Sequence, residues 1–162
     1  MTQNTIDTTV PLTTAQLAEH VTQLFSEHMP FNQLLGLKIN KLSQDEVEIR
    51  LPWDKKLMGN PIHKILHGGV TAAILDTVGG LMAILYAVKE IDNVTLDEFQ
   101  KTLPNVGTID MRVDYLRPGK GDEFIATAQV IRKGKKVAVC RMELHNEAGT
   151  HIAFGTGTYM IS

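Results

Sequence analysis

The sequence predicts an α+β fold in which an antiparallel sheet covers one long apolar helix. Short segments that alternate apolar and polar residues recur along the chain and are separated by turn-forming residues, which is typical of half-buried strands. Residues 70–88 are apolar on nearly every side, as expected of a helix that a sheet surrounds. The short connections between the later strands favour antiparallel pairing over a doubly wound parallel fold.

Length and composition indicate how many domains the chain forms and which classes of partner it attracts. A length of 162 residues with 43% apolar and 21% charged residues suits one folded domain, which we place at residues 13–162 after a flexible N-terminus at residues 1–12. The formal net charge of −2 gives no global field that would attract nucleic acid or an anionic membrane. Since the sequence also has no recognisable DNA-reading helix, we expect no nucleic-acid partner.

Cys140 is the single cysteine of the sequence. One cysteine excludes an internal disulfide and a thiolate metal cluster, which fits a reducing compartment. Its place in an apparent strand predicts a packing role. The N-terminus lacks a basic start followed by an apolar core, so we expect no secretory signal and a cytoplasmic protein.

The N-terminal part is predicted to form a helix and then a hairpin. Thr13 or Thr14 caps the helix, which runs to about His28, with Pro30 past its end. The pattern changes to alternating residues over 35–51. The hairpin consists of strands at 37–39 and 47–51 around the turn Ser43-Gln44-Asp45, and Pro52 begins a loop that continues irregularly over 57–66.

The glycine pair Gly68-Gly69 opens the long helix, which ends near Glu90. The segment Val70–Val88 is also long and apolar enough to resemble a membrane span. Asp76 lies near its middle between two threonines, where an acid in lipid would be costly. We therefore predict a core helix and no membrane partner.

The C-terminal half is predicted to form a short helix and then strands. Polar residues 91–104 predict a helix from Asp92 through Lys101, ended by Pro104. Four strands follow, separated by turns rich in glycine, proline and asparagine. They are Gly107–Leu116, Phe124–Arg132, Lys136–His145 and His151–Met160. The short connections predict a meander in which each of these strands pairs with the next.

The start of the long helix is the strongest functional signal. Two glycines there let a ligand approach the backbone, and the unpaired N–H groups form an anion or oxyanion site. Asp76 lies seven residues after Gly69, which places it on nearly the same face about 10 Å along the axis. Catalysis needs contact-range geometry, so one helix cannot serve one carbonyl with both groups.

A second copy of the helix resolves this separation. If two helices pack antiparallel around a two-fold axis, each Asp76 lies opposite the glycine start of the other helix. The spacing therefore predicts a homodimer with two composite sites. A dimer of such dimers is equally compatible with the sequence.

His63 and His67 are candidate metal ligands, because they are four residues apart. On a helix this spacing can bind zinc. Lys64 stands where a zinc-binding helix would carry glutamate, and no further ligand cluster is visible. We therefore predict no metal.

Four motifs together carry a family resemblance. They are Gly59-Asn60-Pro61, Leu66-His67-Gly68-Gly69 with Leu75-Asp76, Thr108-Ile109-Asp110-Met111, and Tyr115-Leu116-Arg117-Pro118. As a set they resemble the hotdog-fold acyl-CoA thioesterases of the phenylacetate-degradation (PaaI-like) type, over roughly residues 33–160. The resemblance implies an antiparallel sheet of five to six strands wrapped around one long central helix, with an extra N-terminal helix here. It also implies active sites across a dimer interface.

The resemblance implies roles for the residues at the helix. Asp76 would be the general base or the nucleophile that attacks the thioester, and the Gly68 and Gly69 amides would form the oxyanion hole. Both roles make physical sense, because a thioester carbonyl gains negative charge on attack. The alternative for Asp76 is a buried acid that is merely satisfied by hydrogen bonds.

Three further residues would frame the same carbonyl. The resemblance implies that His67 supports the loop or the carbonyl, that Asn60 donates to the site, and that Thr108 positions the hydrolytic water. Asn60 lies one residue further from His67 than in many relatives, so local backbone hydrogen bonds are an equal alternative for it. Threonine is also common in strands for structural reasons alone.

Basic residues are candidates for the phosphates of coenzyme A, although charged hairpin tips are often only solvated. They are Arg117, Arg132, Lys133, Lys135 and Lys136. An acyl tunnel is conceivable along the long helix, where such a stripe is more often core. The stripe consists of Leu81, Met82, Leu85 and Tyr86.

We therefore expect a hydrolase that converts acyl-CoA thioesters to free acid and coenzyme A. Coenzyme A is part of the substrate, and no cofactor is expected. The alternatives are a non-catalytic acyl-CoA binding or sensor protein, and a hotdog dehydratase or hydratase that acts on acyl thioesters. A dehydratase would require a catalytic histidine paired with an acid, for which His67 and Asp76 are the sole candidates in the sequence.

Overall fold

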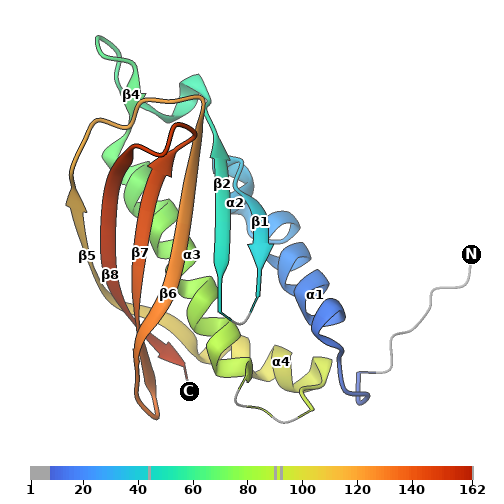
Figure 1. The fold of residues 1–162 in the computed structure, drawn as a ribbon. Helices are drawn as coiled ribbons and strands as arrows, with labels where there is room; N and C mark the ends of the chain where they lie inside the picture. Colours follow the sequence, from blue (N-terminus) through green and yellow to red (C-terminus); the bar gives the residue numbers. More distant parts are fainter. Residues whose placement is uncertain (1–7, 44, 90, 92, 162) are drawn as a thin grey trace, which may run out of the picture.

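A six-stranded antiparallel sheet wraps around one long helix (Figure 1). The computed structural model describes residues 8–43, 45–89, 91 and 93–161. The sheet has the order β1-β2-β6-β7-β8-β5, and β3 and β4 form a separate two-stranded sheet. The strands are β1 (Lys38–Leu42), β2 (Val47–Pro52), β3 (Met58–Asn60), β4 (Ile65–Leu66), β5 (Val106–Tyr115), β6 (Glu123–Lys133), β7 (Val137–Asn146) and β8 (His151–Ile161).

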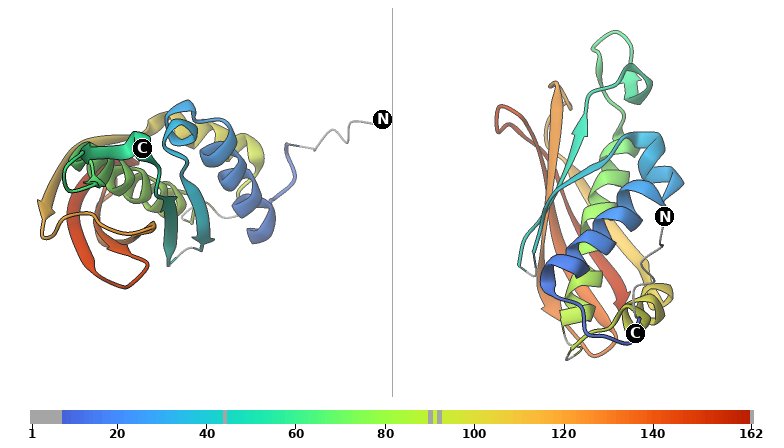
Figure 2. Two further views of the ribbon diagram at one scale, coloured as in Figure 1. Left: turned by 90° about the horizontal axis from the view of Figure 1, so that it is seen from above. Right: turned by 90° about the vertical axis from the view of Figure 1, so that its right-hand side faces the viewer.

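The helices flank this sheet on its concave side. They are α1 (Thr14–Glu27), α2 (Pro30–Leu35), α3 (Gly68–Lys89) and α4 (Leu96–Thr102), with short 3-10 turns η1 (Lys55–Leu57) and η2 (Leu103–Asn105). The sheet curves around α3, as the view from above shows (Figure 2). The predicted architecture of a sheet around a central helix, with an extra N-terminal helix, is confirmed.

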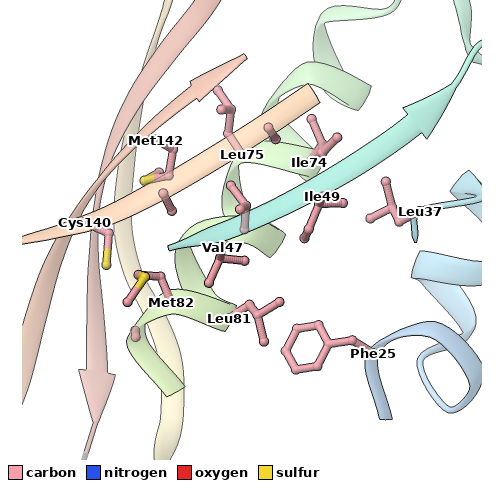
Figure 3. Packing of buried hydrophobic residues seen from close by; sticks show 14 of the residues in the cluster. Phe25, Leu37, Val47, Ile49, Ile74, Leu75, Leu81, Met82, Cys140 and Met142 are labelled. Carbon is pink, nitrogen blue, oxygen red and sulfur yellow. The ribbon is translucent and has the colours of Figure 1, made fainter. Parts of the chain in front are cut away.

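Helix α3 is apolar because nearly all of its faces are covered. By length and composition alone it could cross a membrane, and 61% of its most apolar window is buried inside the protein. Its buried side chains meet the inner faces of β2, β6 and β7 (Figure 3). Leu75 and Leu81 are fully buried there. Its predicted end at Glu90 lies outside the described residues.

Helix α1 begins as the sequence predicts. Thr13 is its N-cap and forms a capping box with Gln16, in which each side chain bonds the other residue's backbone N–H. The buried face of α1 carries Val21 and Phe25, and the Phe25 ring points toward Leu81 of α3 (Figure 3).

A second helix directly after α1 was not predicted. Pro30 lies past the end of α1, as predicted, and it also occupies the first turn of α2. The fixed φ of proline suits this position, where its missing N–H costs nothing. Gly36 ends α2 in the left-handed conformation with φ 79°, and the first strand of the hairpin begins at Lys38, within one residue of its predicted start at 37.

The predicted meander is wrong for its first strand. β6, β7 and β8 pair in succession, but β5 pairs with β8, and β6 also pairs with β2. Residues 116–122 therefore cross from the edge of the sheet to its interior. Turn residues mark where a strand ends, but they do not determine which strand becomes its neighbour. Here the neighbour of β5 is β8.

The two edges of the sheet differ. β1 has five residues, carries Lys38 and Lys41, and contains a bulge, features that protect an edge from further pairing. β5 has ten residues and exposes Ile109 and Tyr115, which are 56% and 55% exposed. Among the described residues, β5 thus offers the longer unpaired edge.

The predicted excursion at 91–104 contains α4. Its N-cap is Thr95, which forms a capping box with Glu98, whereas the predicted start at Asp92 lies outside the described residues. Pro104 lies within η2. The N-terminal segment contacts α4, since Leu12 N–H donates to Val94 O and Asp97 N–H donates to Thr8 O. Residues 1–7 of the predicted flexible N-terminus and Gln44 of the predicted turn also lie outside the described residues.

Candidate active site

Asp76 is joined to the edge strand of the sheet. Its side chain is half-buried on α3, and Thr108 Oγ1 of β5 donates a hydrogen bond of 2.9 Å to Asp76 Oδ1. Ile109 forms a β-bulge directly after Thr108, because the register with β8 shifts between Thr108 and Asp110. Bulges re-aim neighbouring side chains and are frequent beside active sites. The sequence-predicted pair Asp76 and Thr108 therefore meets in the structure.

Tyr159 forms a hydrogen bond with the backbone of the same residue, Asp76. Its hydroxyl donates to the backbone oxygen of Asp76 at 3.3 Å, and the residue is 1% exposed. Burial, followed by the charge of Asp76, raises the pKa of the Tyr159 phenol, so it stays a protonated donor. Gly79 leaves room for it, since a Cβ at this position would collide with the Tyr159 hydroxyl.

Asp76 lines an apolar cleft. The cleft has a volume of about 170 Å³ and lies between α1 and α2 on one side and α3 with the start of β5 on the other. Its lining includes Phe25, Met29, Ile84 and Val106. Buried Asn32 fixes the α1–α2 corner, because its Nδ2 donates to Phe25 O at 2.9 Å. The acid is thus adjacent to a space suited to an apolar chain.

The start of α3 is organised by His67. Its Nδ1 accepts the Gly69 N–H at 2.8 Å, an N-cap interaction that leaves Nε2 as the protonated nitrogen of a neutral imidazole. Gly68 N–H makes no hydrogen bond within the described residues, while Gly68 O accepts from the Tyr115 hydroxyl at 2.8 Å. Of the two predicted oxyanion donors, the Gly68 amide is therefore available and the Gly69 amide is engaged.

Asn60 makes local backbone hydrogen bonds, which is the alternative role that its spacing from His67 left open. Its Oδ1 accepts from the N–H groups of Ile62 and His63 at 3.0 and 3.1 Å, which stabilises the β3–β4 turn. The neighbouring Gly59 packs against His67, and a Cβ at Gly59 would lie 2.7 Å from His67 Cα. This turn therefore supports the imidazole through packing. His63 is exposed on the turn.

A second cavity surrounds the helix start. It has a volume of about 370 Å³ and is lined by Gly68, Thr71, Tyr115 and Arg117. The Arg117 guanidinium donates to His151 O at 3.0 Å, which holds it at the rim. Gly68 and Asp76 are eight residues apart on one helix, or about 12 Å along the axis, so a single chain does not bring them together.

The predicted basic residues do not form one patch in a single chain. Arg117 lies at the start of α3, whereas the other four lie on the β6–β7 hairpin beside the end of α3 (Figure 1). There Lys133 Nζ lies 4.8 Å from the Tyr86 ring centroid. The 22 residues of α3 separate the two ends by about 33 Å. Arg132, Lys133, Lys135 and Lys136 form the hairpin group.

The stripe on the long helix is core for its buried members, the favoured of the two interpretations of the sequence. Leu81, Met82 and Leu85 are at most 5% exposed and pack in the core. The cleft beside Asp76 is lined instead by residues that sequence reasoning missed, namely Phe25, Met29, Asn32 and Tyr159. Asn32, a polar residue within an apolar stretch, was the one local signal for that corner.

Comparison with known proteins identifies the family. A sequence model described as the thioesterase superfamily matches residues 63–153, more than half of the chain. The chain belongs to the thioesterase superfamily. The match includes the glycine pair, Asp76 and Thr108 but excludes α1 and α2.

Individual relatives of this superfamily member extend over nearly the whole chain. The medium/long-chain acyl-CoA thioesterase YigI of Escherichia coli K12 is 41% identical over 150 residues, covering 93% of the chain and 97% of the relative. A crystal structure of a Shewanella oneidensis protein related to the thioesterase superfamily has 54% identity and a TM-score of 0.87, covering 91% and 97% of the two chains. The predicted hotdog fold and thioesterase family are confirmed, and the phenylacetate-degradation subtype stays a prediction.

Proposed function

We propose that this protein hydrolyses medium- and long-chain acyl-CoA thioesters to free acid and coenzyme A in the cytoplasm. The observation that carries the proposal is the hydrogen bond between Thr108 and Asp76 at the edge of an apolar cleft. It presents a carboxylate beside space for an acyl chain. The name of the E. coli relative, which acts on medium and long chains, supports this substrate class.

Asp76 has one oxygen held and one available. Thr108 bonds Oδ1, and no hydrogen bond to Oδ2 is formed within the described residues. As a general base, Oδ2 takes a proton from water, the hydroxide attacks the carbonyl carbon, and the C–S bond breaks to release the coenzyme A thiolate. As a nucleophile, Oδ2 attacks the carbonyl carbon, the C–S bond breaks to release the coenzyme A thiolate, and water then hydrolyses the resulting anhydride to the free acid and the Asp76 carboxylate. Neither route requires a cofactor.

The helix start supplies donors for the developing oxyanion. The Gly68 N–H is unpaired within the described residues, and the Nε2–H of His67 is a second candidate, because Nδ1 is occupied by Gly69. Preorganised donors of this kind are worth on the order of 3 kcal/mol each in the barrier. The oxyanion hole that we propose is therefore Gly68 with His67, rather than the two glycine amides alone.

We propose a composite site across a homodimer. The separation of about 12 Å between Gly68 and Asp76 supports it, since an antiparallel partner helix would place its acid opposite the glycine start. The unpaired ten-residue edge of β5, which carries Thr108 and exposed Ile109, supports pairing at this side. The cleft volume of about 170 Å³ is below the ~300–1,000 Å³ of typical ligand sites, as expected if a second chain completes it.

The same dimer would bring Arg117 of one chain close to the basic hairpin of the other. If the partner's Asp76 aligns with Gly68, its Tyr86 lies ten residues further along, about 15 Å beyond the helix start. Lys133 contacts Tyr86, so the partner's basic hairpin would approach the groove that holds Arg117. We propose that Arg117 and this hairpin bind the phosphates of coenzyme A.

The test is thiol release from short, long and aromatic acyl-CoAs by the wild type, Asp76→Asn and the control Asp110→Asn. Asp110 is an exposed acid on the same strand as Thr108 and is not one of the residues that line the cleft. We expect Asp76→Asn to lose at least ~100-fold in turnover, as removal of an acid-base group does, and Asp110→Asn to keep its turnover.

The alternatives give different outcomes. Acyl-CoA binding without turnover across the panel would indicate a binding or sensor protein. Hydration of an enoyl-CoA without thiol release would indicate a hydratase. Sedimentation at the assay concentration checks the dimer, and a fully active monomer would contradict the composite site.

A further inference from the structure

Three metal-binding side chains converge on the outer face of the sheet. Glu143 and His145 are two residues apart on β7, so they share a face, and buried Leu144 between them points to the core. His151 of β8 is paired directly opposite His145. Two residues at i and i+2 and a third across the ladder form a triangle on a rigid surface. This triangle lies on the opposite face of the sheet from α3 and Asp76.

The donor atoms of the triangle lie close together. One ligand atom from each of Glu143, His145 and His151 lies within 4.8 Å of the other two. The two imidazoles stack with 4.4 Å between ring centroids and 14° between planes. Donors that surround zinc at about 2.0–2.1 Å lie within ~4 Å of one another, so the donor atoms must approach by less than about 1 Å. Because the lone pair of an imidazole nitrogen lies in the ring plane, at least one of the two stacked rings must also turn out of the stack to bind the same ion.

The triangle has unsatisfied polar groups. His151 Nε2 is buried and has no hydrogen-bond partner within the described residues. Such an orphaned nitrogen is rare in folded proteins and calls for an explanation. Glu143 forms no ion pair among the described residues. The nearby Arg141 donates to Thr156 Oγ1 at 3.2 Å and places its guanidinium 4.5 Å from the Phe154 ring centroid. A bound cation would give the buried His151 nitrogen a partner and would balance the charge of the partly exposed Glu143 carboxylate.

We propose that Glu143, His145 and His151 bind a divalent transition-metal ion, with zinc as the favoured ion. Imidazole nitrogen is a poor ligand for calcium and magnesium, which prefer oxygen, whereas two histidines and a carboxylate suit zinc. Three protein ligands leave a fourth position for water or another ligand. The site is distinct from the exposed His63 and from His67, whose Nδ1 is occupied by Gly69.

The experiment titrates EDTA-stripped, dialysed full-length protein with ZnCl₂ against a competing chromophoric chelator. The variants are His145→Gln, His151→Gln and the control His63→Gln, which removes an exposed loop imidazole. We expect one zinc per chain in the wild type and in the control. Each of the other two variants should lose at least ~100-fold in affinity, since loss of a ligand exceeds the ~10–100-fold effect of outer-shell changes.

A second measurement keeps the proposal falsifiable if a histidine variant folds poorly. Glu143→Gln alters the carboxylate ligand alone, and CoCl₂ gives a visible absorption band that reports coordination by nitrogen and oxygen. The wild type should show the band and a zinc-dependent rise in melting temperature, and Glu143→Gln should show neither. Zinc binding that is equal in all variants, or that is lost in His63→Gln instead, would overturn the proposal.

Discussion

Thr108 Oγ1 donates to Asp76 Oδ1 across 2.9 Å, which links the exposed edge strand to the acid of the central helix. The bulge at Ile109 directly follows this contact. The orientation of the carboxylate therefore depends on the conformation of β5, the strand whose edge is unpaired within the described residues. Any pairing at that edge would act directly on the position of the acid.

Thr108→Val removes this hydrogen bond and keeps the shape of the side chain. A hydrogen bond to a charged group is worth about 1.5–3 kcal/mol, so we expect kcat to fall ~10–100-fold with a smaller change in KM. Thr108→Ser keeps the hydroxyl and should retain most of the activity. Steady-state kinetics on one acyl-CoA separates the two parameters. Equal kcat values for the valine and serine variants would contradict a positioning role.

His67 is predicted to serve stability and catalysis through different nitrogens. His67→Asn retains an N-cap acceptor for Gly69 N–H, whereas His67→Ala loses it, at a cost of about 1 kcal/mol in the free energy of unfolding. Both variants lack the Nε2–H donor, so both should lose ~100-fold in kcat. Urea unfolding and turnover measure the two effects. Full activity of the asparagine variant would exclude His67 from the oxyanion hole.

Met29→Ala is predicted to shift the acyl preference toward longer chains. Met29 lines the cleft beside Asp76, and its truncation extends the apolar space. Each buried methylene is worth about 0.8 kcal/mol, so kcat/KM for chains that reach the new space should rise ~4-fold per added methylene. Val21→Ala is the matched control, since Val21 is buried on α1 outside the cleft lining. An unchanged chain-length profile would place the acyl chain elsewhere.

Cys140 is predicted to be inert in the folded protein. The residue is fully buried, and burial raises the pKa of its thiol to about 12. The reactive thiolate is therefore negligible at pH 8, and the side chain is inaccessible. Native protein incubated with iodoacetamide should keep its mass, and unfolded protein should gain one adduct. Rapid alkylation of the native state would show that β7 opens readily.

The positions of most helices and strands could be predicted from local sequence patterns, but the pairing between strands could not. Alternation located β6, β7 and β8 to within one or two residues, and a capping threonine located α1. The pairing of β5 with β8 depends on the path of the chain around α3, which has no local signature. Helix α2 was missed because proline is equally suited to follow a helix and to start one, and Pro30 does both.

Site residues could be predicted where a chemically suitable residue type occurs at a suitable spacing on the helix. Gly68 and Asp76 could be selected by residue type and spacing, whereas Thr108 was selected through the family resemblance, and the structure joins Asp76 to Thr108. The engagement of Gly69 by His67 depends on a single rotamer, which the sequence does not specify. The contribution of Phe25 to the cleft arises because α1 and α2 pack beside α3, a long-range contact invisible to a window of neighbouring residues.

The cleft beside Asp76 combines residues from two parts of the chain. The superfamily match at residues 63–153 contains the acid, the glycine helix start and Thr108. The wall formed by Phe25 and Met29 belongs to α1 and the corner that follows it, outside that segment. Substitutions in the N-terminal helical pair are therefore expected to change which acyl groups are accepted without touching the residues proposed for hydrolysis.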